Sequence, residues 1–237
     1  MKAYRIYSGR KQDALELIEH TVSNPTAREV RVRVRAVSLN FRDLMIAWGT
    51  YPIPSDPPPI AVCDGAGEVI AVGPQVTRFK VGDHVAIPYY PDWIDSEPTP
   101  ERIHKVPGAT IDGVLAEEIL VPEDVLISVP SWLEFTEAAT LPCAGVTAWN
   151  ALFVGGAAKP GNTVLLLGTG VVSIWALQLA KAAGLRTIIT SSRDEKLERA
   201  LPRSGSHDQL SPRSRMAGGG AADHRRTGRR CRCRSRW

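Results

Sequence analysis

Two glycines, Gly168 and Gly170, mark the stretch with the clearest chemistry. They follow an uninterrupted apolar run over 163–167 and precede an amphipathic run from Val172, which predicts a buried strand, a tight turn and a helix. In a dinucleotide-binding unit the first glycine allows the sharp turn, the second lets the backbone approach a pyrophosphate, and free N–H groups of the helix bind its charge. The third small position is Ser173, so the motif alone also fits an ordinary strand-to-helix turn. The residues predicted to contact the cofactor here are Gly168, Thr169, Gly170, Val171 and Val172.

The sequence after this turn favours the cofactor interpretation. Gly184 is typical of a helix C-cap, and 185–190 (LRTIIT) predicts a second buried strand. Ser191, Ser192 and Arg193 follow about twenty residues after the turn, where a ribose-binding residue is expected. An acidic residue there would bind the ribose 2′-hydroxyl, whereas two serines and an arginine leave room and charge for a 2′-phosphate. We therefore predict NADP, with NAD as the alternative; Arg193 is also open to interpretation as a solvated loop cation.

Composition bounds the class of protein. The 237 residues, 43% hydrophobic and 23% charged, fit one large or two modest globular domains. No apolar run reaches membrane length, and residues 1–10 lack the apolar stretch of a signal peptide, so we expect a cytoplasmic protein with no membrane partner. The four cysteines form neither a spaced disulfide framework nor a C-x-x-C pair, which predicts reduced thiols.

The net charge of +4 is confined to the C-terminal tail. Residues 201–237 contain ten arginines and two aspartates, so residues 1–200 carry a net charge of −4. An RNA-binding interpretation therefore rests on the tail alone, and we predict no nucleic-acid partner for the folded body.

Residues 1–128 are predicted to be rich in β-strands. Residues 29–35 (EVRVRVR) alternate valine and arginine, as a half-solvated strand does, and 65–73 form a strand bounded by glycines. His84 is predicted to be a strand surface residue and not a ligand. The proline-rich segments 52–59 and 88–107 are predicted loops of the kind that line clefts.

Six segments in chain order resemble a known family. They are SLNFRDL (38–44), DGAGEVIAVG (64–73), VGDHV (81–85), DGVLAEEILVP (112–122), EAATLPCAGVTAWNAL (137–152) and GTGVVSIWALQLAKAAG (168–184). Together they resemble the medium-chain dehydrogenase/reductase superfamily, most closely its zinc-independent alcohol dehydrogenase-like and quinone oxidoreductase-like members. The resemblance implies an α/β plus β fold that consists of a GroES-like β-rich N-terminal catalytic domain (1–128), an incomplete Rossmann domain with a doubly wound parallel sheet (129–200) and an Arg-rich disordered tail (201–237).

The same resemblance implies hydride transfer between a nicotinamide dinucleotide and a small-molecule carbonyl, alcohol or enone. Full-length relatives are expected to be homo-oligomers. The alternative is a non-catalytic GroES-like interaction module in which the cofactor unit is vestigial.

The resemblance also bears on zinc. Zinc-bearing relatives use Cys, His and Cys with an adjacent acid, and these positions fall on Asn40, Cys63 and Cys143, with Asp64 as the acid. An amide is a poor zinc ligand, so catalytic zinc is disfavoured, although Cys63, Cys143 and Asp64 could still hold a metal if they converge. The lobe that holds structural zinc in relatives, here 90–111, contains no cysteine, so structural zinc is excluded.

Without a Lewis acid, hydrogen bonds must polarise the substrate oxygen, which suits activated carbonyls and enones. The candidate catalytic residues are Asn40, Tyr51, Asp64 and Cys143, and the resemblance places Thr147 where relatives support the nicotinamide ring. Structural interpretations stay open: Asn40 as a turn residue, Cys143 as a small buried hydrophobe and Asp43 as a loop-fixing acceptor.

The resemblance stops near Ala200. Relatives continue with segments like ALGADH-INYR and GADVVVEVGG, whereas 201–237 lacks Ile, Val, Phe and Tyr, which predicts no third buried strand. If the tail is back-translated and the reading frame is shifted by one nucleotide, codons can be chosen so that 202–216 encodes LGADHMINYRPDPEW. In the same way, 228–237 can encode GADVVVDVG. We therefore interpret the tail as out-of-frame and the chain as truncated, a hypothesis that the coding DNA tests. An incomplete sheet predicts an aggregation-prone C-terminal half with little or no turnover.

Overall fold

A computed structural model describes residues 1–51, 53, 56–204 and 209–210. The chain divides into two compact units, Met1–Cys143 and Ala144–Trp237, each of which is described here by itself. The domain boundary predicted from the sequence, between residues 128 and 129, falls at the end of strand β7 (Ile127–Ser128), inside the first unit. None of the helices that the structure describes is long and apolar enough to cross a membrane.

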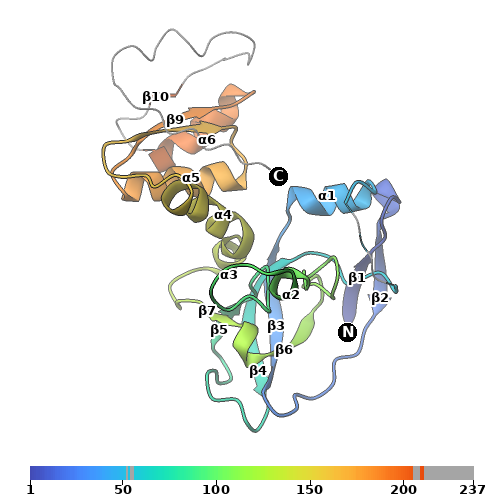
Figure 1. The fold of residues 1–237 in the computed structure, drawn as a ribbon. Coiled ribbons are helices and arrows are strands. Elements are labelled where there is room, and N and C mark those ends of the chain that lie inside the picture. The colour runs from blue at the N-terminus through green and yellow to red at the C-terminus, as the bar shows by residue number, and fades with distance from the viewer. Residues whose placement is uncertain (52, 54–55, 205–208, 211–237) are drawn as a thin grey trace. The chain divides into compact units, whose positions relative to one another are not determined.

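The first unit is built mainly from antiparallel strands (Figure 1). Its strands are β1 (Lys2–Ile6), β2 (Leu15–Glu19), β3 (Glu29–Ser38), β4 (Asp64–Val72), β5 (His84–Ala86), β6 (Glu118–Pro122) and β7. Its helices are α1 (Phe41–Ala47), α2 (Pro100–Ile103) and α3 (Phe135–Ala138), with the short helical turns η1 (Lys11–Asp13) and η2 (Glu123–Val125). The π-helical segment η3 (Leu141–Gly145) spans the boundary between the two units.

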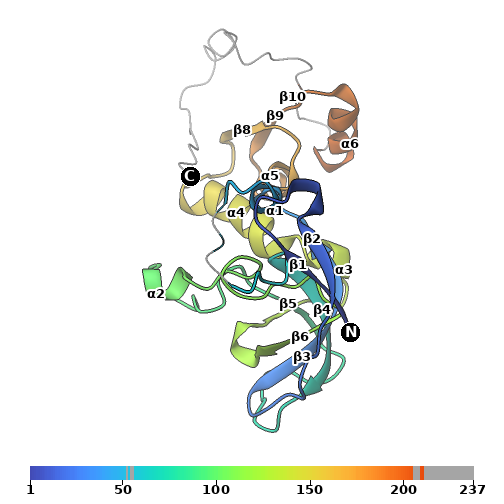
Figure 2. The same ribbon diagram turned by 90° about the vertical axis from the view of Figure 1, so that its right-hand side faces the viewer.

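A five-stranded sheet in the order β6-β3-β4-β5-β7 forms the body of this unit. Figure 2 labels four of its strands, β3, β4, β5 and β6. The predicted alternation along β3 is confirmed: Val30 and Val32 are 0% exposed, while Arg33 and Arg35 face solvent. The valines pack into a core with residues from the neighbouring strands because successive side chains of a strand point to opposite faces.

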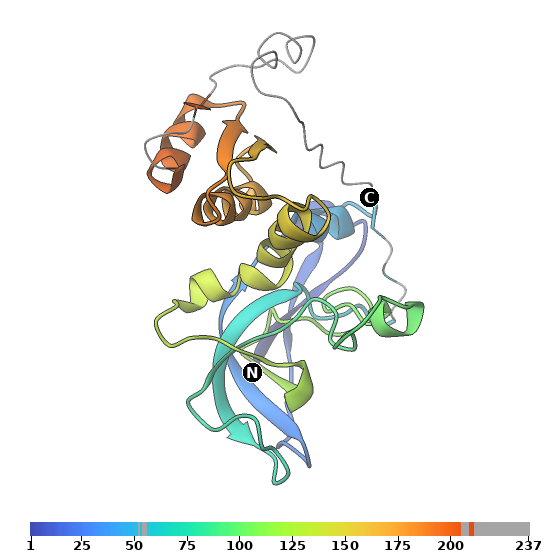
Figure 3. The ribbon, with the colours of Figure 1, turned by 60° about the vertical axis from the view of Figure 1, so that its left-hand side comes forward.

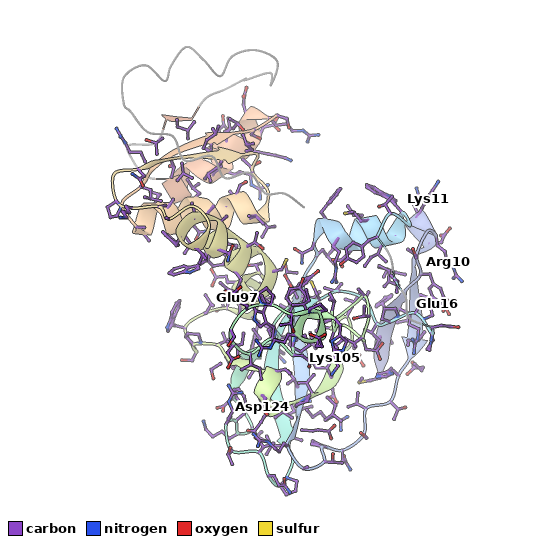
Figure 4. All side chains as sticks on the ribbon, in the orientation of Figure 1. Arg10, Lys11, Glu16, Glu97, Lys105 and Asp124 are labelled. Carbon is purple, nitrogen blue, oxygen red and sulfur yellow. The ribbon has the colours of Figure 1, made fainter. Side chains whose placement is uncertain are left out.

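A separate antiparallel hairpin of β1 and β2 carries charges at its turn. The Arg10 Nη1 and Glu16 Oε2 atoms lie 3.7 Å apart there, and Figure 4 shows both side chains at the same end of the hairpin. Both are about half exposed, so this ion pair contributes little to stability.

Glu123, in η2, is a buried carboxylate that fixes a distant loop. Its Oε2 accepts hydrogen bonds from the backbone N–H groups of Thr77 (2.9 Å) and Arg78 (2.8 Å), and its Oε1 lies 3.0 Å from Arg28 Nη2. The N–H of Arg78, together with that of Thr77 and the arginine charges, lowers the pKa of Glu123 from its ordinary value of 4.5. The ionised carboxylate therefore ties the 74–78 loop to the start of η2.

This arrangement predicts a pH-dependent loss of stability in Glu123→Gln. Because the folded-state pKa is lowered, the carboxylate contributes stability above pH 4.5, and that contribution is lost as pH falls through the folded-state pKa. We expect Glu123→Gln to lower the melting temperature at pH 7, with a difference from wild type that narrows below pH 4.5. Calorimetry at both pH values measures this; an equal difference at all pH values would contradict the electrostatic explanation.

The second unit is a parallel α/β arrangement (Figure 3). Its elements are α4 (Val146–Trp149), η4 (Asn150–Val154), β8 (Thr163–Leu167), α5 (Val171–Ala182), β9 (Arg186–Thr190), α6 (Asp194–Ser204) and β10 (Gln209–Leu210). The two predicted strands and the helix between them are confirmed, and β8 pairs in parallel with β9. The predicted burial of β8 is wrong, because only Leu166 of this strand is buried. Gly184 has a φ of +69°, which fits its predicted place at the helix end.

Two elements after Ala200 were not predicted from the sequence. Helix α6 continues to Ser204, and Gln209 and Leu210 form β10, which pairs in parallel with β9 at Ile188 and Ile189. Pairing needs only backbone N–H and C=O groups, so a segment without β-branched residues can still add a short strand. The remainder of the tail, including Cys231 and Cys233 and most of the proposed out-of-frame segment, lies outside the described residues.

The prediction for His84 also needs correction. Its ring packs against Phe135, with the ring centroids 4.4 Å apart, and its Nδ1 is buried. The alternation of a strand predicts which face a residue occupies but not that a helix such as α3 covers that face, so this side chain is half-buried and not a solvated surface residue.

One face of the β8–β9 sheet stays open among the described residues. Leu165 and Leu167 of β8 are 54% and 61% exposed, whereas Leu166, on the opposite face, is 7% exposed and packs in the helix-covered core. Helix α5 contacts both strands, and α6 contacts β9. The exposed leucines are the apolar surface that the sequence predicted for an incomplete sheet.

We expect the open face to cause aggregation without contributing to stability. The double variant Leu165→Thr/Leu167→Thr should aggregate less in light scattering while its free energy of unfolding changes by less than about 1 kcal/mol. The matched control, Leu166→Thr on the covered face, should lose about 2 to 3 kcal/mol. Similar losses for the control and the double variant would show that the open face is covered in solution.

Candidate functional site

The pairing of β3 with β4 builds the first half of the site. Ser38, the last residue of β3, lies opposite Asp64, the first residue of β4, so the segment that follows β3 runs beside the start of β4. Asn40 precedes helix α1 and donates from Nδ2 to Asp64 Oδ2 at 2.9 Å and to Cys63 Sγ at 3.5 Å. The structure thus brings two predicted candidates, Asn40 and Asp64, into direct contact.

Cys63 and Asp64 form a buried thiol–carboxylate pair. Both residues are 0% exposed, and the Cys63 thiol donates to Asp64 Oδ1 at 3.1 Å. Burial raises the pKa of Asp64, an effect that the hydrogen bond from Asn40 opposes. Burial and the neighbouring Asp64 carboxylate also raise the pKa of Cys63 strongly, so the thiol stays protonated near neutral pH.

Arg42, on α1, adds a buried cation beside this pair. Its Nη2 donates to the carbonyl oxygen of Pro107 at 2.9 Å and lies 3.4 Å from Asp43 Oδ1. Asp43 also accepts the backbone N–H of Asn40 at 2.8 Å through Oδ2, which confirms that it fixes the loop before α1. The Arg42 Nη1 is 3.4 Å from the hydroxyl of Tyr89.

Three tyrosines continue the cluster away from Arg42. Tyr89 meets the ring of Tyr90 edge-on, with centroids 4.7 Å apart, and burial raises the pKa of Tyr89. Burial raises the pKa of Tyr90, and the neighbouring Tyr51 and Cys143 raise it further. The candidates Tyr51 and Cys143 are thus close enough to Tyr90 to affect its pKa.

The second unit contains the predicted cofactor turn. Gly168 has a φ of +83°, a conformation that favours glycine, and its N–H donates to Thr190 Oγ1 at 3.3 Å. Gly170 precedes α5, and a Cβ added there would meet no atom within 4 Å. The first helical hydrogen bond runs from Ile174 N to Gly170 O at 3.0 Å, so the N–H groups of Val171, Val172 and Ser173 precede the intrahelical ladder and face the turn.

The turn is joined to the end of β9 by hydroxyl groups. Thr169 Oγ1 lies 3.3 Å from Ser191 Oγ, and Ser191 Oγ accepts the N–H of Arg193 at 3.4 Å. A hollow of about 390 Å³ follows the strand end, and its lining is Ser191, Ser192, Arg193, Asp194 and Glu195. Asp194 and Glu195 were not predicted as site residues, and their carboxylates oppose the positive potential that Arg193 brings to this hollow.

Thr147 lies on α4 and is half-buried. Helix α4 packs against α5, which begins at the glycine turn. The expectation that Thr147 supports a nicotinamide ring stays a prediction.

Comparisons with known proteins agree with a β-rich first unit and a nucleotide-binding type of second unit. Residues 26–131 match the alcohol dehydrogenase GroES-like domain family. A zinc-type alcohol dehydrogenase-like protein of Schizosaccharomyces pombe is 46% identical over 181 residues, which are 76% of this chain and 52% of that protein. The chain belongs to the medium-chain dehydrogenase/reductase superfamily.

Two solved structures of this superfamily superpose on the chain. An NAD-dependent alcohol dehydrogenase has a TM-score of 0.79 and 31% identity, with coverage of 90% of this chain and 63% of that chain. Escherichia coli quinone oxidoreductase complexed with NADPH has a TM-score of 0.70 and 25% identity, with coverage of 89% and 58%. This medium-chain dehydrogenase/reductase chain therefore spans between about half and two thirds of the length of these relatives.

At the positions where the resemblance places zinc ligands, Asn40 and Cys63 are hydrogen-bonded to each other and to Asp64. The Asn40 amide uses its nitrogen as a donor toward Asp64 and Cys63, and the Cys63 thiol is itself a donor to Asp64. A zinc ligand must instead present a lone pair, and a thiol must first lose its proton. Within the described part of the chain, no group of three or more His, Cys, Asp or Glu side chains is placed to hold a metal ion.

Arg42, Tyr89 and Tyr90 are the site residues that the sequence did not single out. Arg42 lies inside the NFRD segment, where an arginine next to an apolar helix face signals a buried partner. The two tyrosines lie in the proline-rich loop that was predicted to line a cleft, so the loop was identified but not its side chains.

Proposed function

We propose that this medium-chain dehydrogenase/reductase chain derives from an oxidoreductase that transfers a hydride between NADP(H) and a carbonyl, alcohol or enone without catalytic zinc. The observation that carries the proposal is the open backbone at Gly170 in front of α5, where a Cβ would meet no atom within 4 Å. The alcohol dehydrogenase and quinone oxidoreductase names of its relatives support the same reaction class. A cytoplasmic location and homo-oligomeric assembly belong to this proposal.

The second unit fits a nicotinamide dinucleotide. The N–H groups at the start of α5, from Val171 to Ser173, would bind the pyrophosphate, while Thr169 and Ser191 lie at the ribose end of the turn. The dinucleotide, when bound, supplies or accepts the hydride. The protein residues bind its phosphates, and the approach is close because Gly170 has no side chain.

The first unit supplies the groups that would act on the substrate oxygen. Asp64 and Cys63 orient the Asn40 amide, whose Nδ2 donates to Asp64 Oδ2 at 2.9 Å and to Cys63 Sγ at 3.5 Å. The amide would donate to a substrate oxygen by exchanging the longer of these two bonds. We assign proton donation to the hydroxyl of Tyr51. Hydrogen bonds polarise an oxygen less strongly than zinc does, so we assign the substrate class to activated carbonyls and enones.

The cofactor preference is tested by binding. We expect NADPH to bind at least about 10-fold more tightly than NADH in calorimetry, a difference of about 1.4 kcal/mol, because Arg193 lines the hollow in which a 2′-phosphate would lie. Arg193→Ala should remove most of this preference while NADH affinity stays nearly constant. Lys196→Ala is the matched control, because Lys196 carries the same charge on α6 but does not line the hollow.

Two outcomes would contradict the assignment. Tighter binding of NADH would show that Asp194 and Glu195 dominate the hollow and that the chain prefers NAD. A folded protein that binds neither nucleotide would favour the alternative, a GroES-like interaction module with a vestigial cofactor unit.

A further inference from the structure

We propose that Val62 is a positioning residue whose left-handed backbone conformation brings the Cys63 thiol to Asp64 and Asn40. Val62 has a φ of +69°, in the region that favours glycine, although its side chain is β-branched. Only the use that the Asn40 amide makes of its position rests on the proposed oxidoreductase function. The conformation itself is a property of the folded first unit.

The two residues after Val62 converge on one side chain. The Asn40 Nδ2 lies 2.9 Å from Asp64 Oδ2 and 3.5 Å from Cys63 Sγ, and Cys63 Sγ lies 3.1 Å from Asp64 Oδ1. Neighbouring residues of an extended strand point to opposite faces, so a strand that ran through Cys63 into Asp64 would separate these two side chains. Strand β4 begins only at Asp64, and the left-handed residue lies directly before the converging pair. The turn at Val62 therefore sets the direction in which Cys63 points.

Backbone hydrogen bonds and core packing hold Val62 in this conformation. The N–H groups of residues 113–115 donate to the carbonyl oxygens of residues 60–62, and Val62 O accepts from Val114 N at 2.9 Å. The Val62 side chain is 2% exposed and packs in the core of the unit. A strained backbone conformation persists where the surrounding structure fixes it in this way, and such residues concentrate at functional sites.

Two glycines pack directly against the backbone of Val62. A Cβ added at Gly108 would lie 2.8 Å from Val62 N and 2.9 Å from Val62 C, and one added at Gly113 would lie 2.1 Å from Val62 O. A change of φ at Val62 would displace the atoms that these glycines contact. The close packing therefore opposes relaxation of the turn.

A purely structural role for Val62 makes a different prediction from a positioning role. If the side chain only fills core volume, glycine removes more of that volume than alanine does and should disturb the neighbouring residues more. If the backbone conformation matters, glycine adopts a positive φ without strain. Alanine keeps the strain and loses most of the packing that holds it in place. The order of the two variants separates these explanations.

The first measurement is urea unfolding of the two variants. We expect Val62→Gly to unfold at a higher urea concentration than Val62→Ala, because only glycine is unstrained at this φ. Val85 is the matched control, since it is also a buried valine, 0% exposed, but lies in strand β5. There the order should be reversed, with Val85→Gly less stable than Val85→Ala. The control order at both positions would overturn the proposal.

The second measurement follows Asn40 and Cys63 in the full chain. Labelling with ¹⁵N-asparagine reports the Asn40 side-chain amide, which Asn40→Ala assigns, and the S–H infrared band of Cys63 is assigned by its loss in Cys63→Ala. We expect Val62→Ala to shift both signals and Val62→Gly to leave them closer to their wild-type positions. A larger shift in Val62→Gly would overturn the proposal, because loss of packing alone produces that order.

Gly108→Ala decides the question if neither Val62 variant folds. Its Cβ would press on the backbone of Val62, while its other close contact, Arg42 Nη2 at 3.0 Å, is the end of a flexible side chain. We expect this variant to shift the Asn40 and Cys63 signals. The control Gly82→Ala, with a φ of +91° and no atom within 4 Å of an added Cβ, should shift neither. Unshifted signals in Gly108→Ala would overturn the proposal.

Turnover separates the role of Val62 from the proposed function. Where NADPH turnover is present, Val62→Ala should lower kcat by about 10-fold or more with little change in KM, because the Asn40 amide is displaced from the substrate oxygen. Val62→Gly should recover part of that loss. The expected signals without any turnover would reject the oxidoreductase function alone. Turnover with the larger shift in Val62→Gly would reject the role of Val62 alone.

Discussion

Replacement of Gly113 by alanine is expected to destabilise the first unit by at least about 3 kcal/mol, which is enough to unfold a marginal domain. Gly113 donates its N–H to Ile60 O at 2.8 Å, and its backbone packs directly on the 60–62 segment. An added Cβ would lie 2.1 Å from Val62 O and 2.5 Å from Ala61 O. These atoms belong to the backbone, so no side-chain rotation can relieve the overlap.

Urea unfolding and hydrogen exchange of peptides around 60–62 and 113–115 would measure this effect. Gly82→Ala is the matched control, because Gly82 has a φ of +91° but no atom within 4 Å of an added Cβ. The control should lose only about 1 to 2 kcal/mol from its backbone conformation. A Gly113→Ala variant that unfolds at the same urea concentration as the control would show that the 113–115 segment can move away from 60–62.

The elements that the sequence predicted correctly are those whose pattern is local. The alternation of valine and arginine along β3 and the glycine turn between β8 and α5 each depend on fewer than about twenty consecutive residues. Gly168 and Gly184 both have positive φ, a backbone conformation that favours glycine, so the residue type alone indicates a turn at these positions.

The site was harder to predict because its contacts join distant segments. Asn40 and Asp64 meet only because β3 and β4 pair in a register that sets Ser38 opposite Asp64. The link from Arg42 to Tyr89 depends in addition on where a proline-rich loop folds back, and no periodicity encodes that path. The family resemblance identified Asn40 and Asp64 as site residues. The buried guanidinium of Arg42 beside them was found only in the structure.

The limit of residue composition as a guide is visible in the C-terminal part. The absence of Ile, Val, Phe and Tyr after Ala200 predicted no third buried strand, and what the structure adds there is a strand of two residues, Gln209 and Leu210, that pairs with β9 through backbone atoms. Residue composition indicates how much apolar surface a segment can bury. It does not indicate whether the backbone N–H and C=O groups of that segment pair with the edge of a sheet.

Gly170→Val is expected to abolish nicotinamide dinucleotide binding without unfolding the second unit. The φ of −76° at Gly170 is allowed for any residue, and nothing in the described structure lies within 4 Å of an added Cβ, so the side chain fits the folded protein. The same space is where a pyrophosphate must approach the N–H groups at the start of α5.

We expect the NADPH dissociation constant to rise about 10-fold in Gly170→Ala and more than about 100-fold in Gly170→Val, which correspond to losses of about 1.4 and 2.7 kcal/mol. Calorimetric binding together with thermal unfolding separates the two effects. Gly155→Ala is the matched control, because its nearest contact would be an ordinary 3.6 Å to Asn150 O, far along the chain from the turn. Equal NADPH affinity in wild type and Gly170→Val would remove the glycine turn as the pyrophosphate site, since a bound phosphate and a valine side chain cannot occupy the same space.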